Sequence, residues 1–312
     1  MSSEPLTCRI CKHSASHVVE RLTGEQLRLL WRTLGREFSL PAWGKLVPDY
    51  VVELRQCERC GFEFFDPALA GNEAFYRELE HAEYFVENRP EFGRTLQLVR
   101  KFGLRRVLDV GCGSGIFLEL ARQSGCETCG LELNPAAAEK ARARGHRVFS
   151  RLLHELKPGE VGEGFELITL FQVLEHVPEP VTLLRQAATL LRPGGYISVA
   201  VPSAECVLRL VPWDPHQWPP HHLSRWRLGD FAQLARTAQV TLVRTGGDPL
   251  LGSEISHFWN VHNQLAPALG KPRRPGNPTA IAAISFLYRK TGMKFLLPHW
   301  GSSIYAYFQR AN

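Results

Sequence analysis

Hydrophobic positions change period within residues 107–118, VLDVGCGSGIFL. An unbroken apolar run leads into three closely spaced glycines, and apolar residues then recur at helical spacing over 116–121. The first pattern predicts a buried strand and the second predicts a helix that packs on it. Together they indicate the strand–turn–helix unit that begins a doubly wound parallel sheet.

The turn places Gly111, Gly113 and Gly115 at alternate positions. Glycine adopts backbone conformations closed to other residues and lets a ligand approach bare backbone, so these three are predicted to border a ligand. We expect Ser114 to cap the helix that follows.

Acidic residues accompany this turn. Asp109 lies within the first strand, where its carboxylate would face a cationic ligand. A second predicted strand, 128–133, contains Glu132 about 20 residues after the turn begins, the spacing at which a carboxylate accepts hydrogen bonds from ribose hydroxyls.

Alternating helix and strand patterns continue along the chain. Asn134 and Pro135 mark the start of a helix that runs to Arg144. Further strands are predicted at 146–149, 165–171, 196–201, 240–245 and 303–308, and further helices at 181–191 and 228–238. The fold class is therefore α/β, with a seven-stranded Rossmann-like doubly wound sheet whose last strand forms an antiparallel hairpin edge. Ligands bind at the carboxyl ends of such strands, which places Phe171 and Gln172 near the ligand.

Two CxxC pairs, Cys8 with Cys11 and Cys57 with Cys60, lie near the start of the chain. Two such pairs complete a tetrahedral, closed zinc site of the structural type, so we predict a small zinc ribbon over residues 1–68. Neighbouring histidines could substitute as ligands. A third CxxC, Cys126 with Cys129, begins a strand, where residues three apart point to opposite faces, and is interpreted as a pair of core thiols.

Composition narrows the function less than the motifs do. The chain of 312 residues carries a net charge of +6, but its basic residues are scattered. It shows neither a signal-peptide pattern nor an apolar run long enough to span a bilayer. A soluble, cytoplasmic protein is expected, in which cysteines serve as metal ligands or buried thiols and not as disulfides.

The ordered segments VLDVGCGSG, GLELNP, FQVLEHV and LLRPGGYISVAVPS resemble those of class I S-adenosylmethionine-dependent methyltransferases of small molecules. The resemblance implies S-adenosylmethionine as cofactor, bound by the three glycines with Asp109, Glu132, Phe171 and Gln172. The sequence departs from the family pattern at 150–153, where it lacks the acidic residue that often binds the adenine amine. The backbone near Leu152 is therefore expected to contact the adenine. The cysteine-rich segment resembles the zinc-binding domain fused to some bacterial methyltransferases of deoxysugar and glycan pathways.

The predicted domain organisation follows from these assignments. The zinc ribbon is followed by a helical linker over 69–103, expected to lie over the cofactor, and by a methyltransferase domain over 104–312. An insertion at 249–300 is expected to form either a lid or acceptor pocket or an exposed basic loop.

Three histidines are candidates for the base that removes a proton from the acceptor. His221 and His222 belong to the Pro- and Trp-rich segment after the fifth strand, and His176 follows the fourth strand. Imidazole titrates near neutral pH, which suits it to this role. The alternative is that they only hold the loops together.

The predicted function is transfer of a methyl group to an oxygen or carbon of a small molecule, such as a nucleotide-sugar or glycan precursor. An RNA methyltransferase that uses the ribbon to bind nucleic acid is a second hypothesis, and a non-catalytic interaction protein is a third. Residues 8–60 carry nine Lys and Arg against six Asp and Glu, too balanced to favour nucleic acid. Acceptor identity and oligomeric state cannot be predicted from these patterns.

Overall fold

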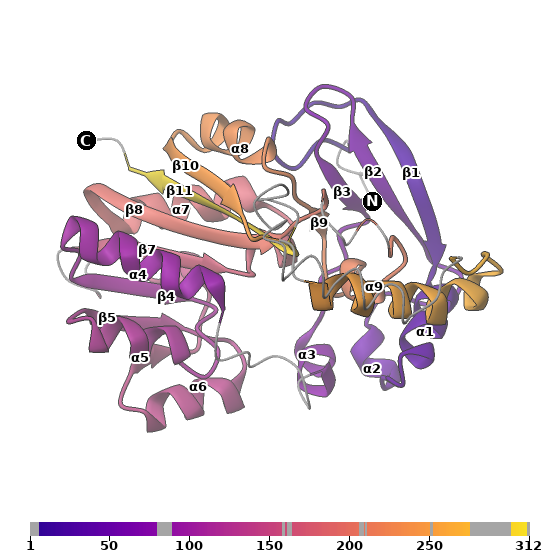
Figure 1. Cartoon of the computed structure of the whole chain (residues 1–312), viewed down its shortest axis with the longest axis horizontal. Coiled ribbons are helices and arrows are strands. Elements are labelled where there is room, and N and C mark those ends of the chain that lie inside the picture. Colours follow the sequence, from indigo (N-terminus) through magenta and orange to yellow (C-terminus); the bar gives the residue numbers. More distant parts are fainter. Residues whose placement is uncertain are drawn as a thin grey trace.

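The structure, a computed structural model, describes residues 6–79, 89–157, 160, 164–205, 209, 211–249, 252–274 and 301–310. Two β-sheets, one large and one small, organise these residues (Figure 1). The predicted insertion at 249–300 lies partly outside the described residues.

The large sheet has seven strands in the order β10-β11-β8-β7-β4-β5-β6. Its strands are β4 (Arg106–Val110), β5 (Glu127–Leu131), β6 (Arg147–Phe149), β7 (Phe165–Phe171), β8 (Leu191–Pro202), β10 (Thr241–Gly247) and β11 (Ser303–Gln309). Strands β4 to β8 pair in parallel, whereas β11 inserts antiparallel between β8 and β10. The predicted fold class is thereby confirmed, and the last strand, β11, is antiparallel as predicted, although β10 and not β11 forms the edge of the sheet.

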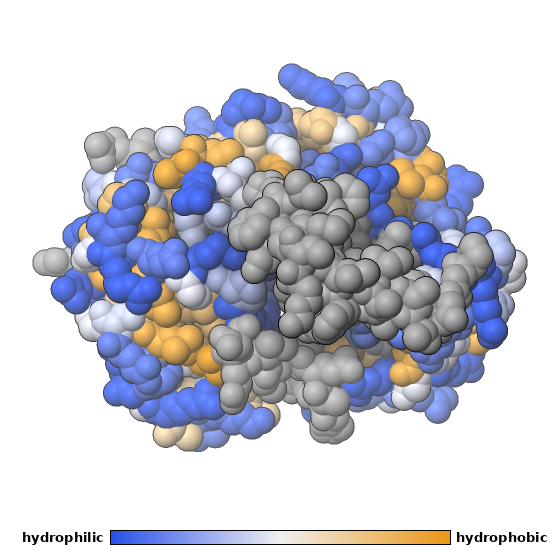
Figure 2. All heavy atoms as spheres, in the orientation of Figure 1, coloured by the Kyte–Doolittle hydropathy of each residue, from blue (hydrophilic) through white to orange (hydrophobic). Residues whose placement is uncertain are grey.

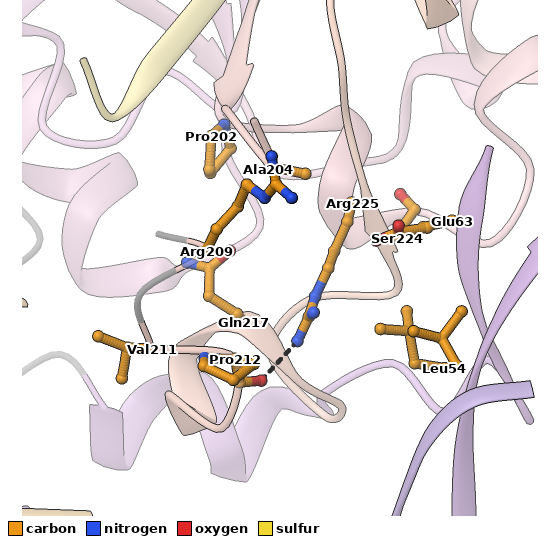
Figure 3. A pocket seen from close by; sticks show the side chains of 11 residues that line it. Leu54, Glu63, Pro202, Ala204, Arg209, Val211, Pro212, Gln217, Ser224 and Arg225 are labelled. Carbon is orange, nitrogen blue, oxygen red and sulfur yellow. Dashed lines mark hydrogen bonds between the residues drawn. The ribbon is translucent and has the colours of Figure 1, made fainter. Parts of the chain in front are cut away.

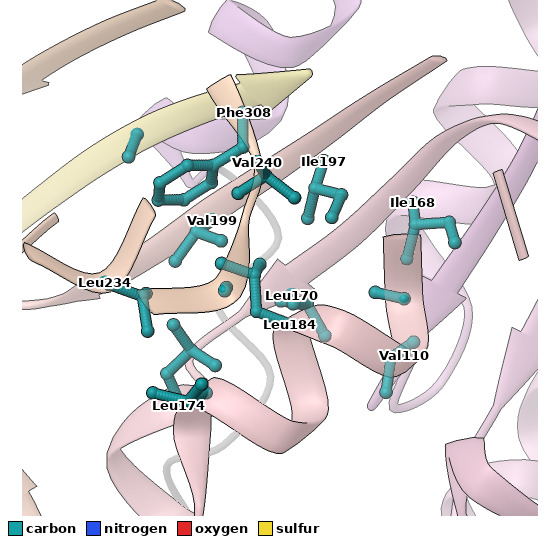
Figure 4. Packing of buried hydrophobic residues seen from close by; sticks show 14 of the residues in the cluster. Val110, Ile168, Leu170, Leu174, Leu184, Ile197, Val199, Leu234, Val240 and Phe308 are labelled. Atoms are coloured by element: carbon teal, nitrogen blue, oxygen red, sulfur yellow. The ribbon is translucent and has the colours of Figure 1, made fainter. Parts of the chain in front are cut away.

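Helices cover both faces of this sheet (Figure 1). They are α4 (Pro90–Phe102), α5 (Ile116–Gln123), α6 (Pro135–Ala143), α7 (Pro180–Leu190) and α8 (Asp230–Ala238). The strands are apolar on both sides because both faces are buried, and every residue of β7 is buried. Figure 4 shows the packing of α7 and α8 on one face, where Leu184 and Leu234 contribute to the same cluster as Ile197 and Phe308.

Local signals in the sequence explain where α6 begins. The Asn134 side chain accepts a hydrogen bond from the Ala137 N–H at 2.9 Å, and Pro135 occupies the first turn. The predicted helix start is confirmed. Helix α6 begins here because the Asn134 side chain accepts a hydrogen bond from one of the backbone N–H groups that the first turn of a helix leaves unpaired.

The small sheet contains the N-terminal strands in the order β1-β2-β3-β9. These are β1 (Ser16–Thr23), β2 (Val51–Cys57), β3 (Glu63–Asp66) and β9 (Ser224–Arg225), with α1 (Gly24–Thr33) and α2 (Leu40–Trp43) between β1 and β2. The short β9 comes from the segment after the fifth strand of the large sheet, so residues far apart in the chain complete the small sheet. Division of the chain at residues 68 and 103 stays a prediction.

The two sheets share hydrophobic packing. Phe62 and Phe64 of the N-terminal region belong to the same buried cluster as Trp226 and Phe231. Helix α9 (Gly252–Leu265) crosses near α1, and the short helix α3 (Glu73–Leu79) lies between the two regions (Figure 1). In the same orientation, hydrophilic residues are spread over the visible face with smaller hydrophobic areas among them (Figure 2).

Candidate active site

A cavity of about 710 Å³ lies at the carboxyl ends of β4, β5 and β7. This volume falls within the range of about 300–1,000 Å³ found for small-molecule sites. We call it the main cavity. Its walls come from the β4–α5 turn, the exits of β5 and β7, and the segments 70–76 and 89–92. The edge of the sheet predicted to bind ligands is therefore the edge that carries the cavity.

The glycine turn borders the main cavity only in part. Gly111 and Gly113 have positive φ angles of 73° and 54° and line the cavity. Gly115, with φ of 79°, is not among the lining residues; a Cβ there would come within 3.0 Å of Ala141 and His146. The third glycine thus allows α5 to approach α6 closely.

Ser114 does not cap α5, so that prediction is wrong. The N-cap residue is Gly115, which has no side chain to accept a hydrogen bond. The Ser114 carbonyl instead accepts a hydrogen bond from Arg144 at 2.8 Å. The left-handed conformation at Gly115 moves the start of the helix one residue beyond the serine.

Glu132 lies beside the glycine turn and lines the main cavity. Its two carboxylate oxygens accept hydrogen bonds from the backbone N–H groups of Gly113 and Asn134, both at 2.8 Å. These contacts fix the carboxylate at the end of β5. A carboxylate held in this way can accept further hydrogen bonds, because each oxygen has two lone-pair positions.

Asp109 also lines the main cavity but is almost fully buried. Burial raises the pKa of its carboxyl group to about 7, against an opposing hydrogen bond from Thr169 at 2.6 Å. Asp109 and Thr169 face each other across the β4–β7 pair. The group therefore changes charge near neutral pH, and a bound cation would favour its ionised form.

The exit of β7 supplies Phe171 and Gln172 to the cavity wall. Phe171 packs against Phe117 and Phe92, with ring centroids 5.0 and 5.4 Å away. Gln172 has a φ of 55°, unusual for a residue other than glycine, and its N–H donates to the Ala200 carbonyl at 2.7 Å. The left-handed residue ends β7 and turns the chain along the cavity.

The three predicted histidines come together in one cluster, which we call the histidine cluster. The ring centroid of His176 lies 4.8 Å from the centroid of His221 and 4.8 Å from that of His222. The centroids of His221 and His222 are 4.4 Å apart. Of the three, His176 lines the main cavity, while His221 and His222 are buried behind it. Burial lowers the pKa of His176 to about 4 and lowers the pKa values of the other two well below the usual range.

Two side chains on the cavity wall were not predicted as site residues. Tyr76 in α3 places its hydroxyl 3.3 Å from His176 Nδ1, and Arg89 precedes α4. Both belong to the segment expected to lie over the cofactor, but its aromatic and charged pattern fits a packed helix equally well. Leu152 also lines the cavity, and the backbone contact to adenine expected there stays a prediction.

The four predicted zinc ligands form a second group, the cysteine cluster. Cys8 Sγ lies 3.6 Å from Cys60 Sγ, and Cys11 Sγ lies 3.5 Å from Cys57 Sγ. Tetrahedral zinc–sulfur bonds of about 2.3 Å imply sulfur separations of about 3.8 Å, so this donor set fits zinc. All four sulfurs lie within 4.8 Å of one another.

The two CxxC turns have matching geometry. The N–H of Lys12 donates to the Cys8 carbonyl at 3.0 Å, and the N–H of Gly61 donates to the Cys57 carbonyl at 2.9 Å. Both residues have positive φ, 60° and 75°. The two CxxC turns therefore have the same backbone conformation, and their four thiols converge on one point. Cys126 and Cys129, by contrast, belong to different buried clusters, as predicted for core thiols.

A smaller cavity of about 190 Å³ lies between the N-terminal sheet and the loop after β8. Figure 3 shows Arg225 extending along it and donating to the Pro212 carbonyl at 2.8 Å. Arg225 also stacks over Phe65 and Trp218. These contacts hold the loop that contains Pro212 and Trp218 against the small sheet, which gives the arginine a structural role.

Comparison with known proteins identifies the family. Residues 77–245 match the model of a methyltransferase domain. A ubiquinone biosynthesis O-methyltransferase of Alkalilimnicola ehrlichii is 30% identical over 193 residues, which cover 53% of this chain and 75% of that protein. The protein of the same name from Stutzerimonas stutzeri is 31% identical over 143 residues, covering 39% of this chain and 62% of its own length.

Solved structures give a weaker likeness. A methyltransferase from Archaeoglobus fulgidus has a TM-score of 0.47 at 16% identity and covers 70% of this chain and 94% of its own. A plantazolicin methyltransferase has a TM-score of 0.48 at 15% identity and covers 76% of this chain and 89% of its own.

The chain belongs to the methyltransferase domain family, and the match covers more than half of its length. It is an S-adenosylmethionine-dependent methyltransferase of the class I fold, as the motifs indicated. Within the described ranges, no helix is long and apolar enough to cross a membrane.

Proposed function

We propose that this protein transfers the methyl group of S-adenosylmethionine to a hydroxyl oxygen of a small molecule. One observation carries the proposal: the cavity that is lined by Gly113 and Glu132 is also lined by Tyr76 and His176. Such a cavity can hold a cofactor against the glycine turn and an acceptor against the imidazole. Joining both in one space aligns the reacting atoms, which is the main source of rate enhancement in this chemistry.

Each candidate site residue on the cavity wall has a separate role in binding or catalysis. Gly111 and Gly113 leave room for the cofactor, Glu132 accepts hydrogen bonds from its ribose, and Asp109 faces its positive charge. S-adenosylmethionine supplies a methyl group bonded to a positively charged sulfur. The acceptor oxygen forms the new bond to carbon, the carbon–sulfur bond breaks, and S-adenosylhomocysteine leaves. His176, the residue of the histidine cluster that lines the cavity, accepts the hydroxyl proton.

Oxygen is favoured over carbon as the methyl acceptor. Both relatives described above are named O-methyltransferases. Apolar residues, among them Phe92, Val173 and Val177, also line the cavity, which suits an acceptor with an apolar body near its hydroxyl. The resemblance of the N-terminal segment predicts a more specific acceptor, a nucleotide-sugar or glycan precursor. An apolar hydroxylated compound and a nucleotide-sugar can be compared directly as substrates.

The cysteine cluster is proposed to hold one structural zinc ion. Four thiolates complete a tetrahedron, which leaves no open position for a substrate. Its place in the buried packing beside Phe62 and Phe64 supports a role in folding, because metal binding then contributes to stability of the N-terminal sheet.

The test offers the purified protein two acceptor panels with S-adenosylmethionine: hydroxylated aromatic compounds and nucleotide-linked sugars. Mass spectrometry of the products identifies the methylated molecule and distinguishes a methoxy group from a carbon-bound methyl. We expect methoxy products from the aromatic panel. Products carrying a carbon-bound methyl would overturn the choice of oxygen, and exclusive methylation of sugars would overturn the apolar acceptor.

A further inference from the structure

A buried carboxyl group next to His176 is not explained by the proposed reaction. Glu175 is 1% exposed, and neither of its side-chain oxygens has a hydrogen-bond partner among the residues that the structure describes. Its Oε1 lies 3.8 Å from Nε2 of His176, which lines the main cavity. Burying a carboxyl group without partners costs free energy, so such a group beside an active site calls for a functional reason.

Backbone contacts with one loop hold Glu175 and His176 in place. Both residues belong to the 3₁₀ turn Leu174–His176 at the exit of β7. The carbonyl of Glu175 accepts a hydrogen bond from the N–H of Leu223 at 2.6 Å. Nδ1–H of His176 donates to the carbonyl of His221 at 2.7 Å. Because a carbonyl can only accept, the neutral ring carries its proton on Nδ1 and its lone pair on Nε2, the nitrogen beside Glu175.

The two groups together form a stronger base than the imidazole alone. Burial lowers the pKa of His176 to about 4, which makes its neutral ring a weak base, and raises the pKa of Glu175 to about 8. Groups this close titrate as a pair, which holds one proton between about pH 4 and about pH 8 and none above. The empty pair therefore takes up a proton with a pKa of about 8, which suits a general base better than a pKa of about 4.

Charged groups of another element face Glu175. Arg89, which precedes α4, favours the ionised form of the Glu175 carboxyl, and Glu91, in the first turn of α4, opposes it. Arg89 and Glu91 lie 3.7 Å apart as an ion pair, so their effects on Glu175 offset each other in part. Burial is thus the main reason that the pKa of Glu175 is raised.

The other titratable groups around the pair stay neutral near pH 7. The hydroxyl of Tyr76 in α3 lies 3.3 Å from His176 Nδ1, and burial together with Glu175 raises the pKa of this phenol well above its usual range. Burial lowers the pKa values of His221 and His222 well below the usual range. None of these three side chains therefore exchanges a proton with the pair at the pH where it titrates.

We propose that Glu175 and His176 act as a proton-accepting pair, in which His176 contacts the acceptor and Glu175 balances the charge that His176 gains. As the acceptor oxygen bonds to the methyl carbon and the carbon–sulfur bond breaks, the hydroxyl proton moves to Nε2 of His176. The imidazolium then faces the Glu175 carboxylate, and the pair releases the proton to water before the next turnover. Glu175 is a positioning residue, since it acts through His176, and this role rests on the proposed function.

The experiment measures turnover against pH at saturating S-adenosylmethionine, with the panel of hydroxylated aromatic compounds as acceptors. Saturation confines the effect of Asp109 to cofactor binding. Wild-type turnover should rise with pH and level off above about pH 8. Glu175→Gln should abolish this rise and lower the plateau about 10²-fold, with KM for the cofactor unchanged. Glu179→Gln is the matched control, because Glu179 follows the same strand but pairs with Lys12 at the surface, and it should keep both features.

A second measurement needs no acceptor. In ¹⁵N NMR spectra of the imidazole groups, the His176 resonances are assigned by their loss in His176→Gln. They should shift near pH 8 in wild type and not in Glu175→Gln. Glu175→Asp keeps a carboxyl group and should retain the shift and part of the turnover. Circular dichroism of each variant identifies misfolding.

Equal turnover and equal pH profiles for wild type and folded Glu175→Gln would overturn the proposal alone. A His176 shift that persists in Glu175→Gln, or a flat turnover profile in folded Glu175→Asp, would overturn it as well. The proposed function fails separately: if wild type methylates no hydroxyl while the His176 shift still depends on Glu175, the pair exists but the reaction assigned to it is wrong.

Discussion

The carboxylate of Glu132 accepts a hydrogen bond from the backbone N–H of Gly113 at 2.8 Å, joining the end of β5 to the turn after β4. A second hydrogen bond from Asn134 N–H holds the other oxygen. Both carboxylate oxygens are thereby oriented before any ligand binds. The arrangement gives the glycine turn and the ribose-binding group a fixed separation, which reduces the ordering required when the cofactor binds.

Replacement of this carboxylate tests the ribose assignment. We expect Glu132→Ala to weaken S-adenosylmethionine binding by about 1.5–3 kcal/mol, the loss of a charged acceptor from two hydroxyls. Glu132→Gln keeps one acceptor oxygen and should lose less. Calorimetry that gave equal affinity for wild type and Glu132→Ala would contradict the assignment.

Space at the glycine turn is a separate requirement. Gly113→Val should abolish cofactor binding, because the side chain would occupy cavity volume and its backbone has a φ of 54°. Gly145→Val is the control: φ there is also positive, at 83°, yet a Cβ would meet open space and the residue is not on the cavity wall. Equal loss of binding in both variants would show that strain, and not occupied space, is responsible.

Affinity for the cofactor should depend on pH through Asp109. Burial raises the pKa of this carboxyl to about 7, so below that pH it is mostly protonated in the free protein. A positively charged ligand favours the ionised form and must then displace the proton, which weakens binding as pH falls, by up to about tenfold per pH unit.

Calorimetry at several pH values checks this dependence, with Asp109→Asn as the matched variant. Titration of the ligand itself contributes equally to both proteins. The part of the slope due to Asp109 is therefore the difference between them. Parallel affinity profiles for wild type and Asp109→Asn would refute the role of this group.

The cysteine cluster predicts one tightly bound zinc ion. Cys57→Ser should lose that zinc and lower the unfolding temperature, because a closed four-thiolate site contributes folding free energy. Cys129→Ser is a suitable control, since Cys129 is also a buried thiol but lies in β5. Metal analysis that found no zinc in freshly purified protein would rule out the site.

His176 should matter for turnover more than for cofactor affinity. Among the histidine cluster it is the residue on the wall of the main cavity. His176→Gln is expected to lower turnover about 10²- to 10⁴-fold with cofactor affinity nearly unchanged, since the imidazole meets the acceptor. Near-normal turnover on an identified acceptor would make the cluster a structural feature of the loop.

Much of the large sheet could be predicted because its signals are local. Strands β4 and β7 are short, largely apolar runs followed by Gly111 and Gln172, and the pair Asn134-Pro135 marks the start of a helix. Cys11-Lys12 and Cys60-Gly61 likewise share a turn that spacing alone reveals. The resemblance to a known family then added the identity of the cofactor, which no local pattern contains.

The remainder depends on contacts between distant segments. β9 joins the N-terminal sheet through residues about 160 positions away, as the pairing of Glu63 with Arg225 shows. Tyr76 reaches His176 across a separation of 100 residues. Periodicity assigned Tyr76 to a helix but could not give the direction in which that helix faces, so its position on the cavity wall required the fold.

The central claim, transfer of a methyl group to a small-molecule hydroxyl, is tested most directly by following the label from [methyl-¹³C]-S-adenosylmethionine. The purified protein is incubated with a cell extract, which is then separated into small molecules, nucleic acid and protein. We predict ¹³C in a methoxy carbon of the small-molecule fraction, absent with Gly113→Val. Label confined to RNA or protein, or present in a carbon-bound methyl group, would contradict the account.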